Sequence, residues 1–134
     1  LQQTRRDLVC RQNGLNTQIL LWWLSDDPRL PAGTRAWIAE PANTIYVSAV
    51  SSWEIWLKVS LGKLEVSGDF ERRLAGESFE KLPLTAGETA GIASLPWHHR
   101  DPADRFIIAT AKLEGLTIVS ADKRFKVYGF PVLT

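Results

Sequence analysis

Short apolar segments alternate with longer amphipathic ones along most of the chain. The short segments are rich in β-branched and aromatic residues, which favours buried strands, and the longer ones repeat apolar residues at helical spacing. The predicted strands are residues 15–21, 44–47, 79–82, 117–120 and 131–133. The predicted helices are residues 32–39, 51–61, 69–74, 85–94 and 102–114.

Residues 102–114 carry the clearest helix signals. Asp101 is a favourable N-cap, Pro102 occupies the preferred first helical position, and Gly115 follows the last apolar turn. Ser51 is expected to begin the helix over residues 51–61. Because strands separated by helices usually pair in parallel, the alternation predicts an α/β fold with a mostly parallel central sheet flanked by helices.

Composition supports one globular domain and gives little indication of a partner. The 134 residues are 45% hydrophobic and 23% charged, with a formal charge of +1. A net charge this small means that any polyanion must be held by a local patch. The single cysteine, Cys10, fits a reducing cytoplasm, and the longest apolar run is too short to span a membrane.

The start of the chain looks different from the rest. Residues 1–14 include three arginines but no apolar stretch of signal-peptide length, and the chain contains no methionine. We expect residues 1–14 to be an N-terminal extension or a segment added to the natural protein. Residues 15–134 are then expected to form the domain.

Four polar residues stand at or just beyond predicted strand ends: Asn16, Glu54, Asp104 and Asp122. Ligands of open parallel sheets bind beyond the carboxyl ends of the strands, so these side chains are expected to converge there. Carboxylate and amide oxygens suit Mg²⁺ or Mn²⁺, and such a site supports metal-assisted hydrolysis of a phosphodiester.

Each carboxylate also has a structural alternative. Glu54 follows Ser51 at capping-box spacing, Asp104 falls in the first turn of a helix, and Asp122 could cap a turn. The two roles are compatible, because a carboxylate in the first turn of a helix can keep an oxygen for an ion.

Three segments carry a resemblance to a known family. They read LNTQILLWWL, WEIWLKVSLGKLEV and HRDPADRFIIATAKLEGLTIVSADKRF, and the match covers nearly all of residues 15–133. In order and spacing they resemble the PIN-domain nucleases of the VapC toxin type. The resemblance implies a three-layer PIN fold and a metal-dependent endoribonuclease that acts as the toxin of a type II toxin-antitoxin module.

By this resemblance, Glu54, Asp104 and Asp122 stand at acidic metal-binding positions, and Asn16 stands where an aspartate is usual. The implied cofactor is Mg²⁺ or Mn²⁺. Asp101 is interpreted as the helix N-cap and not as a ligand.

Further residues are expected around the substrate. Thr17 and Ser120 are expected to orient the carboxylates or a water, or to bond to nearby backbone. His99, Arg100 and Arg105 cluster beside the acids and are candidates for binding RNA phosphates, although solvated loop positions explain them equally well.

Asn16 puts activity in question. An amide keeps one oxygen ligand but lacks the unit charge, which at about 4 Å and an effective dielectric constant near 20 contributes roughly 4 kcal/mol of attraction to a monovalent ion before solvation offsets it. Either the substitution inactivates a toxic nuclease deliberately, or a natural copy has lost activity. We favour the first, because the rest of the acidic set is intact.

The resemblance also implies partners: a cognate VapB-type antitoxin and a second copy of the chain as a homodimer. Most of the six tryptophans are expected in the core, including Trp53 and Trp56, with others lining a groove for a partner helix. One alternative is a catalytically dead module that binds RNA or the antitoxin. Another is a phosphoacceptor receiver-like domain, which lacks its paired acids and its lysine here.

Overall fold

The structure is a computed structural model that describes residues 12–95, 101–120 and 132–133. Within these ranges, five strands form one sheet in the order β3-β2-β1-β4-β5, and every pairing is parallel. The strands are β1 (Gln12–Leu15), β2 (Thr44–Ser48), β3 (Glu80–Leu82), β4 (Thr117–Val119) and β5 (Val132–Leu133). The parallel sheet is confirmed, and its order differs from the 2-1-3-4-5 order of receiver domains.

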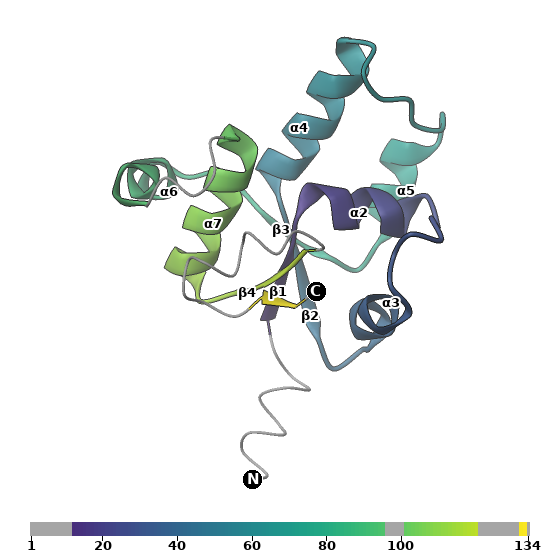
Figure 1. Cartoon of the computed structure of the whole chain (residues 1–134), viewed down its shortest axis with the longest axis horizontal. Coiled ribbons are helices and arrows are strands. Elements are labelled where there is room, and N and C mark those ends of the chain that lie inside the picture. Colours follow the sequence, from purple (N-terminus) through teal and green to yellow (C-terminus); the bar gives the residue numbers. More distant parts are fainter. Residues whose placement is uncertain (1–11, 96–100, 121–131, 134) are drawn as a thin grey trace, which may run out of the picture.

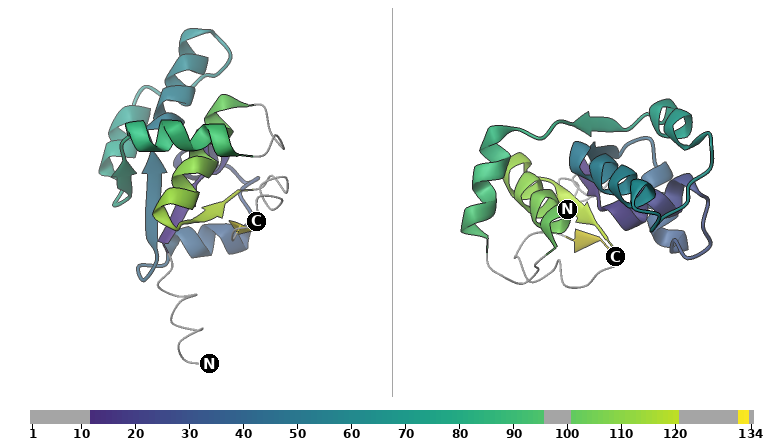
Figure 2. Two further views of the ribbon diagram at one scale, coloured as in Figure 1. Left: turned by 90° about the vertical axis from the view of Figure 1, so that its left-hand side faces the viewer. Right: turned by 90° about the horizontal axis from the view of Figure 1, so that it is seen from above.

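Helices cover both faces of the sheet, which gives the expected three layers (Figures 1 and 2). One side carries α2 (Thr17–Leu24), α3 (Ala32–Ala39) and α5 (Phe70–Gly76). The other side carries α6 (Ala86–Gly91), the 3-10 turn η1 (Ile92–Ser94) and α7 (Pro102–Glu114). Helix α4 (Ala49–Ser60) extends beyond the carboxyl end of β2 and contacts both α2 and α7.

Two apolar clusters pack against the two faces. Successive strand residues point to opposite faces, so Val119 joins the cluster beneath α2 and α3 whereas Ile118 joins the cluster beneath α7. Gly14 belongs to a strand that passes close to the second cluster, since a Cβ there would lie 3.4 Å from Leu116. The sheet is therefore buried on both sides, as parallel sheets usually are.

The prediction of a first strand over residues 15–21 is wrong. The strand is β1, which begins at Gln12, and α2 already begins at Thr17 with Asn16 as its N-cap. An apolar run of this length does not distinguish a buried strand from a buried helix. The strand QNGL is hard to recognise because its pairing with β2 and β4, and not its composition, makes it a strand.

Both ends of α7 lie where local signals predict them, whereas α4 begins earlier than predicted. Asp101 caps α7 by accepting a hydrogen bond from the Asp104 amide, and Gly115 ends it in the left-handed conformation. The expected start of α4 at Ser51 is wrong: Ser48 caps this helix by accepting from the Val50 amide, and Ser51 lies fully buried inside it. Helix α4 then ends before Gly62, which has φ of +72°.

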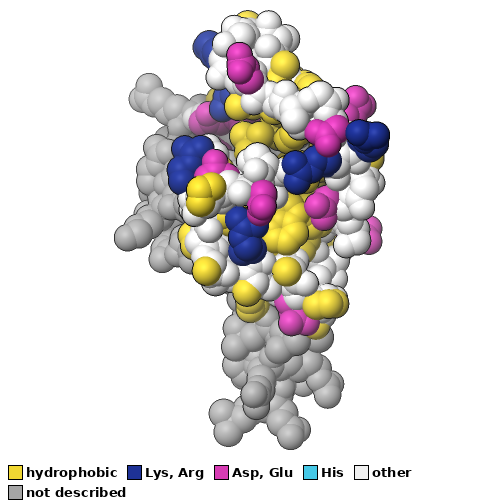
Figure 3. Space-filling view, turned by 90° about the vertical axis from the view of Figure 1, so that its right-hand side faces the viewer, with side chains coloured by type: hydrophobic (Ala, Val, Ile, Leu, Met, Phe, Trp, Pro, Cys, Tyr) yellow, Lys and Arg dark blue, Asp and Glu magenta, His cyan; other side chains and the backbone are white. Residues whose placement is uncertain are grey.

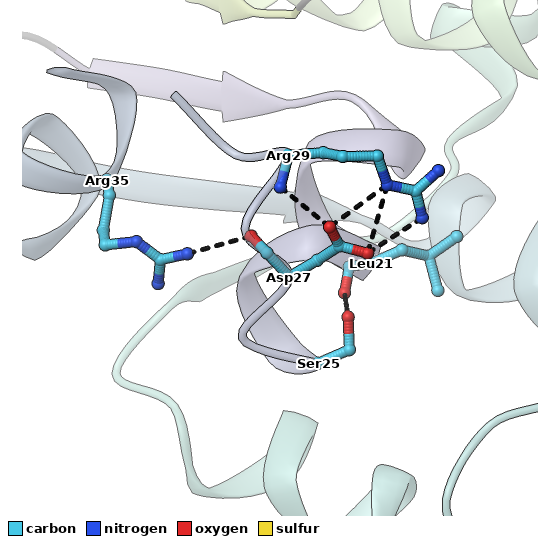
Figure 4. A network of polar contacts seen from close by, with 5 residues as sticks. All are labelled: Leu21, Ser25, Asp27, Arg29 and Arg35. Atoms are coloured by element: carbon cyan, nitrogen blue, oxygen red, sulfur yellow. Dashed lines mark hydrogen bonds and ion pairs between the residues drawn. The ribbon is translucent and has the colours of Figure 1, made fainter. Parts of the chain in front are cut away.

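The turn after α2 is held by charged side chains (Figure 4). Arg29 donates to both carboxylate oxygens of Asp27, and Arg35 Nη2 donates to the Asp27 carbonyl. Arg35 also donates through Nη1 to the Asp26 carboxylate. The Arg29 hydrogen bonds lower the pKa of Asp27 to about 2. The Arg29 guanidinium also lies 5.5 Å from the centroid of a Trp22 ring, within cation–π range.

Two tryptophan side chains of α4 are more exposed than the sequence predicts. Trp53 is 53% exposed and Trp56 is 39% exposed, so the prediction that both pack in the core is wrong. The α4 residues that do reach the core are Ile55, which lies between the two tryptophans in the sequence, and Val50. Among the described residues, no helix is long and apolar enough to cross a membrane.

Candidate functional site

A pocket of about 360 Å³ opens where α2, α4 and α7 meet beyond the carboxyl ends of the strands. We call it the polar pocket. Its lining side chains, listed in chain order, are Asn16, Thr17, Gln18, Leu21, Glu54, Lys58, Asp101 and Asp104. Three of the four residues expected to converge, Asn16, Glu54 and Asp104, thus line one pocket, as the strand-end rule indicates.

Asn16 sits at the base of this pocket with both amide atoms engaged. Its Oδ1 accepts a hydrogen bond from the Ile19 amide at 3.1 Å, which caps α2, and its Nδ2 donates to Ser120 Oγ at 2.9 Å. The backbone N–H of Asn16 also donates a hydrogen bond to the Val119 carbonyl. The residue is 7% exposed. Asn16 and Ser120 therefore form a fixed junction between the ends of neighbouring strands β1 and β4.

A second hydrogen bond ties α2 to α4. Thr17 Oγ1 donates to Ser51 Oγ at 3.2 Å, and both side chains are buried. Glu54 lies one turn after Ser51 on α4, so this contact helps fix the height of Glu54 in the pocket. The sequence predicts only a capping role for Ser51, because no local signal reveals a partner 34 residues away.

Glu54 and Asp104 reach the polar pocket from different helices. Glu54 is half-buried on α4, and Asp104 is half-buried in the first turn of α7. Asp101 is exposed and keeps the N-cap role that the sequence predicts, although it too lines the pocket. The first turn of α7 therefore supplies one carboxylate that caps the helix and a second that faces the same space.

Arg105 does not face the substrate as expected. It is 3% exposed, and its Nη2 donates to the Ile92 carbonyl at 3.0 Å and to the Leu95 carbonyl at 3.3 Å. These bonds attach α7 to the 3-10 turn η1. This burial does not favour the predicted substrate contact, and in the structure the guanidinium joins α7 to η1.

Several predicted residues lie outside the described part of the chain. Asp122, His99 and Arg100 fall in the segments 121–131 and 96–100. Their roles stay predictions. Ser120, the last described residue before Asp122, is fully buried at the end of β4.

The donor chemistry of the polar pocket fits a hard divalent cation. Carboxylate oxygens from Glu54, Asp101 and Asp104 and the amide oxygen of Asn16 line the pocket together, and Mg²⁺ and Mn²⁺ prefer such oxygen ligands. An amide oxygen that accepts one hydrogen bond keeps a second lone pair. Within residues 12–95, 101–120 and 132–133, no three His, Cys, Asp or Glu side chains already stand close enough to hold an ion.

Comparisons with known proteins agree with this architecture. The family model described as PIN domain matches residues 15–131. Ribonuclease VapC22 of Mycobacterium tuberculosis is 30% identical over 123 residues, which cover 87% of this chain and 92% of the relative. The match therefore extends over almost the whole of both chains.

Solved structures share the fold at lower identity. VapBC2 from Rickettsia felis, bound to a DNA fragment from its promoter, has a TM-score of 0.68 at 20% identity and covers 92% of this chain and 97% of its own. A toxin-antitoxin complex from Klebsiella pneumoniae has a TM-score of 0.60 at 22% identity, with 91% and 96% covered. Family model, relative and fold agree: the chain belongs to the PIN-domain family and resembles its VapC members.

Proposed function

We propose that this protein is the toxin of a type II toxin-antitoxin module and that its fold is built to cleave RNA as a metal-dependent endoribonuclease. The observation that carries the proposal is the polar pocket, where Glu54 and Asp104 from separate helices meet Asn16 at the carboxyl ends of the strands. The relative named ribonuclease VapC22 supports the same activity. Asp122 is proposed to complete the acidic set.

Each residue has a defined task in this proposal. Glu54 and Asp104, with Asp122, would hold Mg²⁺ or Mn²⁺. When bound, such an ion lowers the pKa of a water and neutralises charge that develops on the phosphate. Asn16 and Ser120 keep the strand ends in register through their hydrogen bond, and Thr17 holds α2 against α4 through Ser51. The carboxylates are thus oriented before any substrate arrives.

Asn16 is the residue on which activity of this chain depends. Its Nδ2 donates to Ser120 where an aspartate would present a second oxygen. The Ser120 hydroxyl can act as donor or acceptor, so an aspartate fits the same place once this hydroxyl donates to it. We propose that the asparagine weakens the ion site without disturbing the fold, because Asn and Asp cap helices about equally well.

The test is Asn16→Asp with Gln18→Glu as a matched control. Both variants add one carboxylate to the polar pocket, but only the first adds it at the strand end. Asn16→Asp is expected to raise Mn²⁺ affinity by at least about 10-fold, because the added charge is worth up to roughly 4 kcal/mol near an ion. Cleavage of a single-stranded RNA is expected to rise with it, and Gln18→Glu should change both much less.

Two outcomes would count against this proposal. If Asn16→Asp leaves Mn²⁺ affinity and RNA cleavage unchanged, the polar pocket is not the ion-binding site that we propose. Equal gains in the two variants would show that added negative charge, and not its position at the strand end, controls ion binding.

The alternative is a PIN-fold module that binds RNA or an antitoxin without cleaving. The observation that favours it is Asn16 itself, since both polar atoms of its side-chain amide already form a hydrogen bond, Oδ1 with Ile19 and Nδ2 with Ser120. A natural gene that encodes Asn16, together with no cleavage by Asn16→Asp, would select this alternative.

Partners follow from the same proposal. The similarity in fold to a toxin-antitoxin complex from Klebsiella pneumoniae supports a VapB-type antitoxin as the binding partner. We propose RNA as the substrate, a homodimer as the assembly and the cytoplasm as the location. The exposed apolar side chains Trp53, Leu61 and Leu84 leave surface for such contacts.

A further inference from the structure

Lys58 brings a positive charge into a pocket that is otherwise acidic. It follows Glu54 by four residues on α4, so one helical turn separates the two side chains, and both line the polar pocket with Asp101 and Asp104. Three carboxylates repel an approaching phosphodiester. Among the described residues that line the pocket, Lys58 is the one basic side chain.

The Lys58 ammonium is not committed to a neighbouring carboxylate. In the described part of the chain the ion pairs are Asp27–Arg29 and Asp26–Arg35, and neither involves this lysine. Lys58 is also exposed, so its long side chain can reorient toward a ligand. By contrast, the Lys81 ammonium already donates to the Phe79 carbonyl at 3.3 Å.

One described face of the molecule carries charges of both signs. On the face shown in Figure 3, described side chains of both charges are interspersed with apolar surface, and they form no continuous basic patch. The formal charge of the whole chain is only +1. Among the described residues that line the polar pocket, Lys58 is thus the side chain that can form a charge-assisted contact with a phosphate.

We propose that Lys58 binds a non-bridging phosphate oxygen of single-stranded RNA in the polar pocket, beside the carboxylates. The proposal rests on the proposed function, and it adds a substrate-binding residue from α4. A pocket of about 360 Å³ lies at the low end for small-ligand sites, which is a size that suits one nucleotide of a single strand. The lysine would offset the repulsion from Glu54 and Asp104 at the phosphate that enters.

The experiment measures RNA binding by the chain as it stands, with Asn16 in place. Fluorescence anisotropy of a labelled single-stranded RNA in Mn²⁺ is recorded for the parent, Lys58→Ala, Lys58→Arg and the matched control Lys63→Ala. Lys63 is an exposed lysine five residues further on that does not line the polar pocket.

Lys58→Ala is expected to lower RNA affinity by about 10-fold, as expected for one lost charge-assisted hydrogen bond. The slope of log affinity against log salt should become shallower by about 0.7, the value for one phosphate contact on a single strand. Lys58→Arg should keep most of the affinity, and Lys63→Ala should match the parent in both quantities.

Four results would overturn the proposal. If Lys58→Ala and Lys63→Ala have equal RNA affinities and equal salt slopes, Lys58 does not contact an RNA phosphate. RNA affinity unchanged but Mn²⁺ affinity raised in Lys58→Ala would make the lysine an internal counter-ion of Glu54. RNA and Mn²⁺ affinity lost together, or no RNA binding by the parent at low salt, would also refute it. Failure of the nuclease proposal is read separately, from Mn²⁺ binding and cleavage by Asn16→Asp.

Discussion

Helix α4 separates two hollows of similar size and opposite chemistry. The polar pocket has about 360 Å³, and an apolar groove of about 440 Å³ lies on the other side of the helix. The apolar groove is lined mainly by apolar side chains, which are Val47, Ala49, Trp56, Leu74, Ala75, Leu82 and Pro83. Glu54 and Lys58 face the first, whereas Ser52 and Trp56 face the second.

The geometry of the helix explains this division. Each pair is spaced by four residues, and the two pairs are offset by two, which rotates the side chains by about 200° around the helix axis. Ile55 falls between them and is 1% exposed in the core. A single helix thus anchors the fold on one face while it serves two surfaces of different character.

The two regions are also held by different forces. The polar pocket depends on directed hydrogen bonds. Examples are those that Asn16 Nδ2 donates to Ser120 and that the Asp104 backbone amide donates to Asp101. The apolar groove depends on packing: the Trp56 ring meets Phe70 edge to face with centroids 5.8 Å apart. Substitutions should therefore separate ion binding from stability.

The largest expected effect is the loss of ion binding in Asp104→Ala. Removing one carboxylate from the polar pocket takes away a ligand and a unit charge, so Mn²⁺ binding measured by calorimetry should fall below detection. The melting temperature should change little, because Asp101 and not Asp104 supplies the cap of α7. Wholesale unfolding of this variant would show instead that Asp104 is primarily structural.

An intermediate effect is expected for Trp56→Ala, this time on stability. The change removes the contact with Phe70 and the partly buried ring, and should lower the free energy of unfolding by about 2 kcal/mol in urea denaturation. Mn²⁺ affinity should stay at the parent value. Trp53→Ala is the matched control and should cost less, since that ring is 53% exposed. A changed ion affinity in Trp56→Ala would mean that the two regions are coupled through α4.

The smallest effect concerns a turn that belongs to neither region. Hydrogen bonds from Arg29 lower the pKa of Asp27 from 3.8 to about 2, so the ionised form stabilises the fold above about pH 4 and this contribution is lost as the pH falls through 2. The stability difference between the parent and Asp27→Asn should therefore shrink from pH 5 to pH 2. High salt should also reduce it, because the pair is exposed. If the stability difference between the parent and Asp27→Asn does not vary with pH, the Asp27–Arg29 ion pair is not its cause.

Where local signals were complete, the sequence predicted structure well. The helix α7 has its expected cap, first-turn proline and terminal glycine, and α3 matches its predicted bounds. Asn16, Glu54 and Asp104 line one pocket as predicted, because parallel strands bring their carboxyl ends to one edge. Asn16 reaches this edge because the first strand ends at Leu15, and not because of the strand predicted over residues 15–21. Their role in binding an ion stays a prediction.

The predictions that failed share one cause, which is that the outcome depends on contacts with other parts of the chain and not on the local sequence. Nothing in the run ILLWWL distinguishes a strand from a helix, and β1 is identified only by the neighbours that pair with it. Arg105 has the charge of a phosphate ligand, yet its guanidinium is enclosed between α7 and η1. Trp53 and Trp56 have the composition of core residues, yet α4 projects beyond the sheet and leaves them at the surface.

The sequence by itself determined the order of helices and strands from residue 32 onward, the parallel sheet and most of the residues that stand at its carboxyl edge. These features depend on local propensity, caps and a periodicity that each segment carries alone. Only the tertiary structure decided that Ser51 bonds to Thr17, that Arg105 is buried and that Lys58 faces the acids. Such contacts join residues far apart in the chain or depend on the rotation of a helix, which packing sets and no local segment encodes.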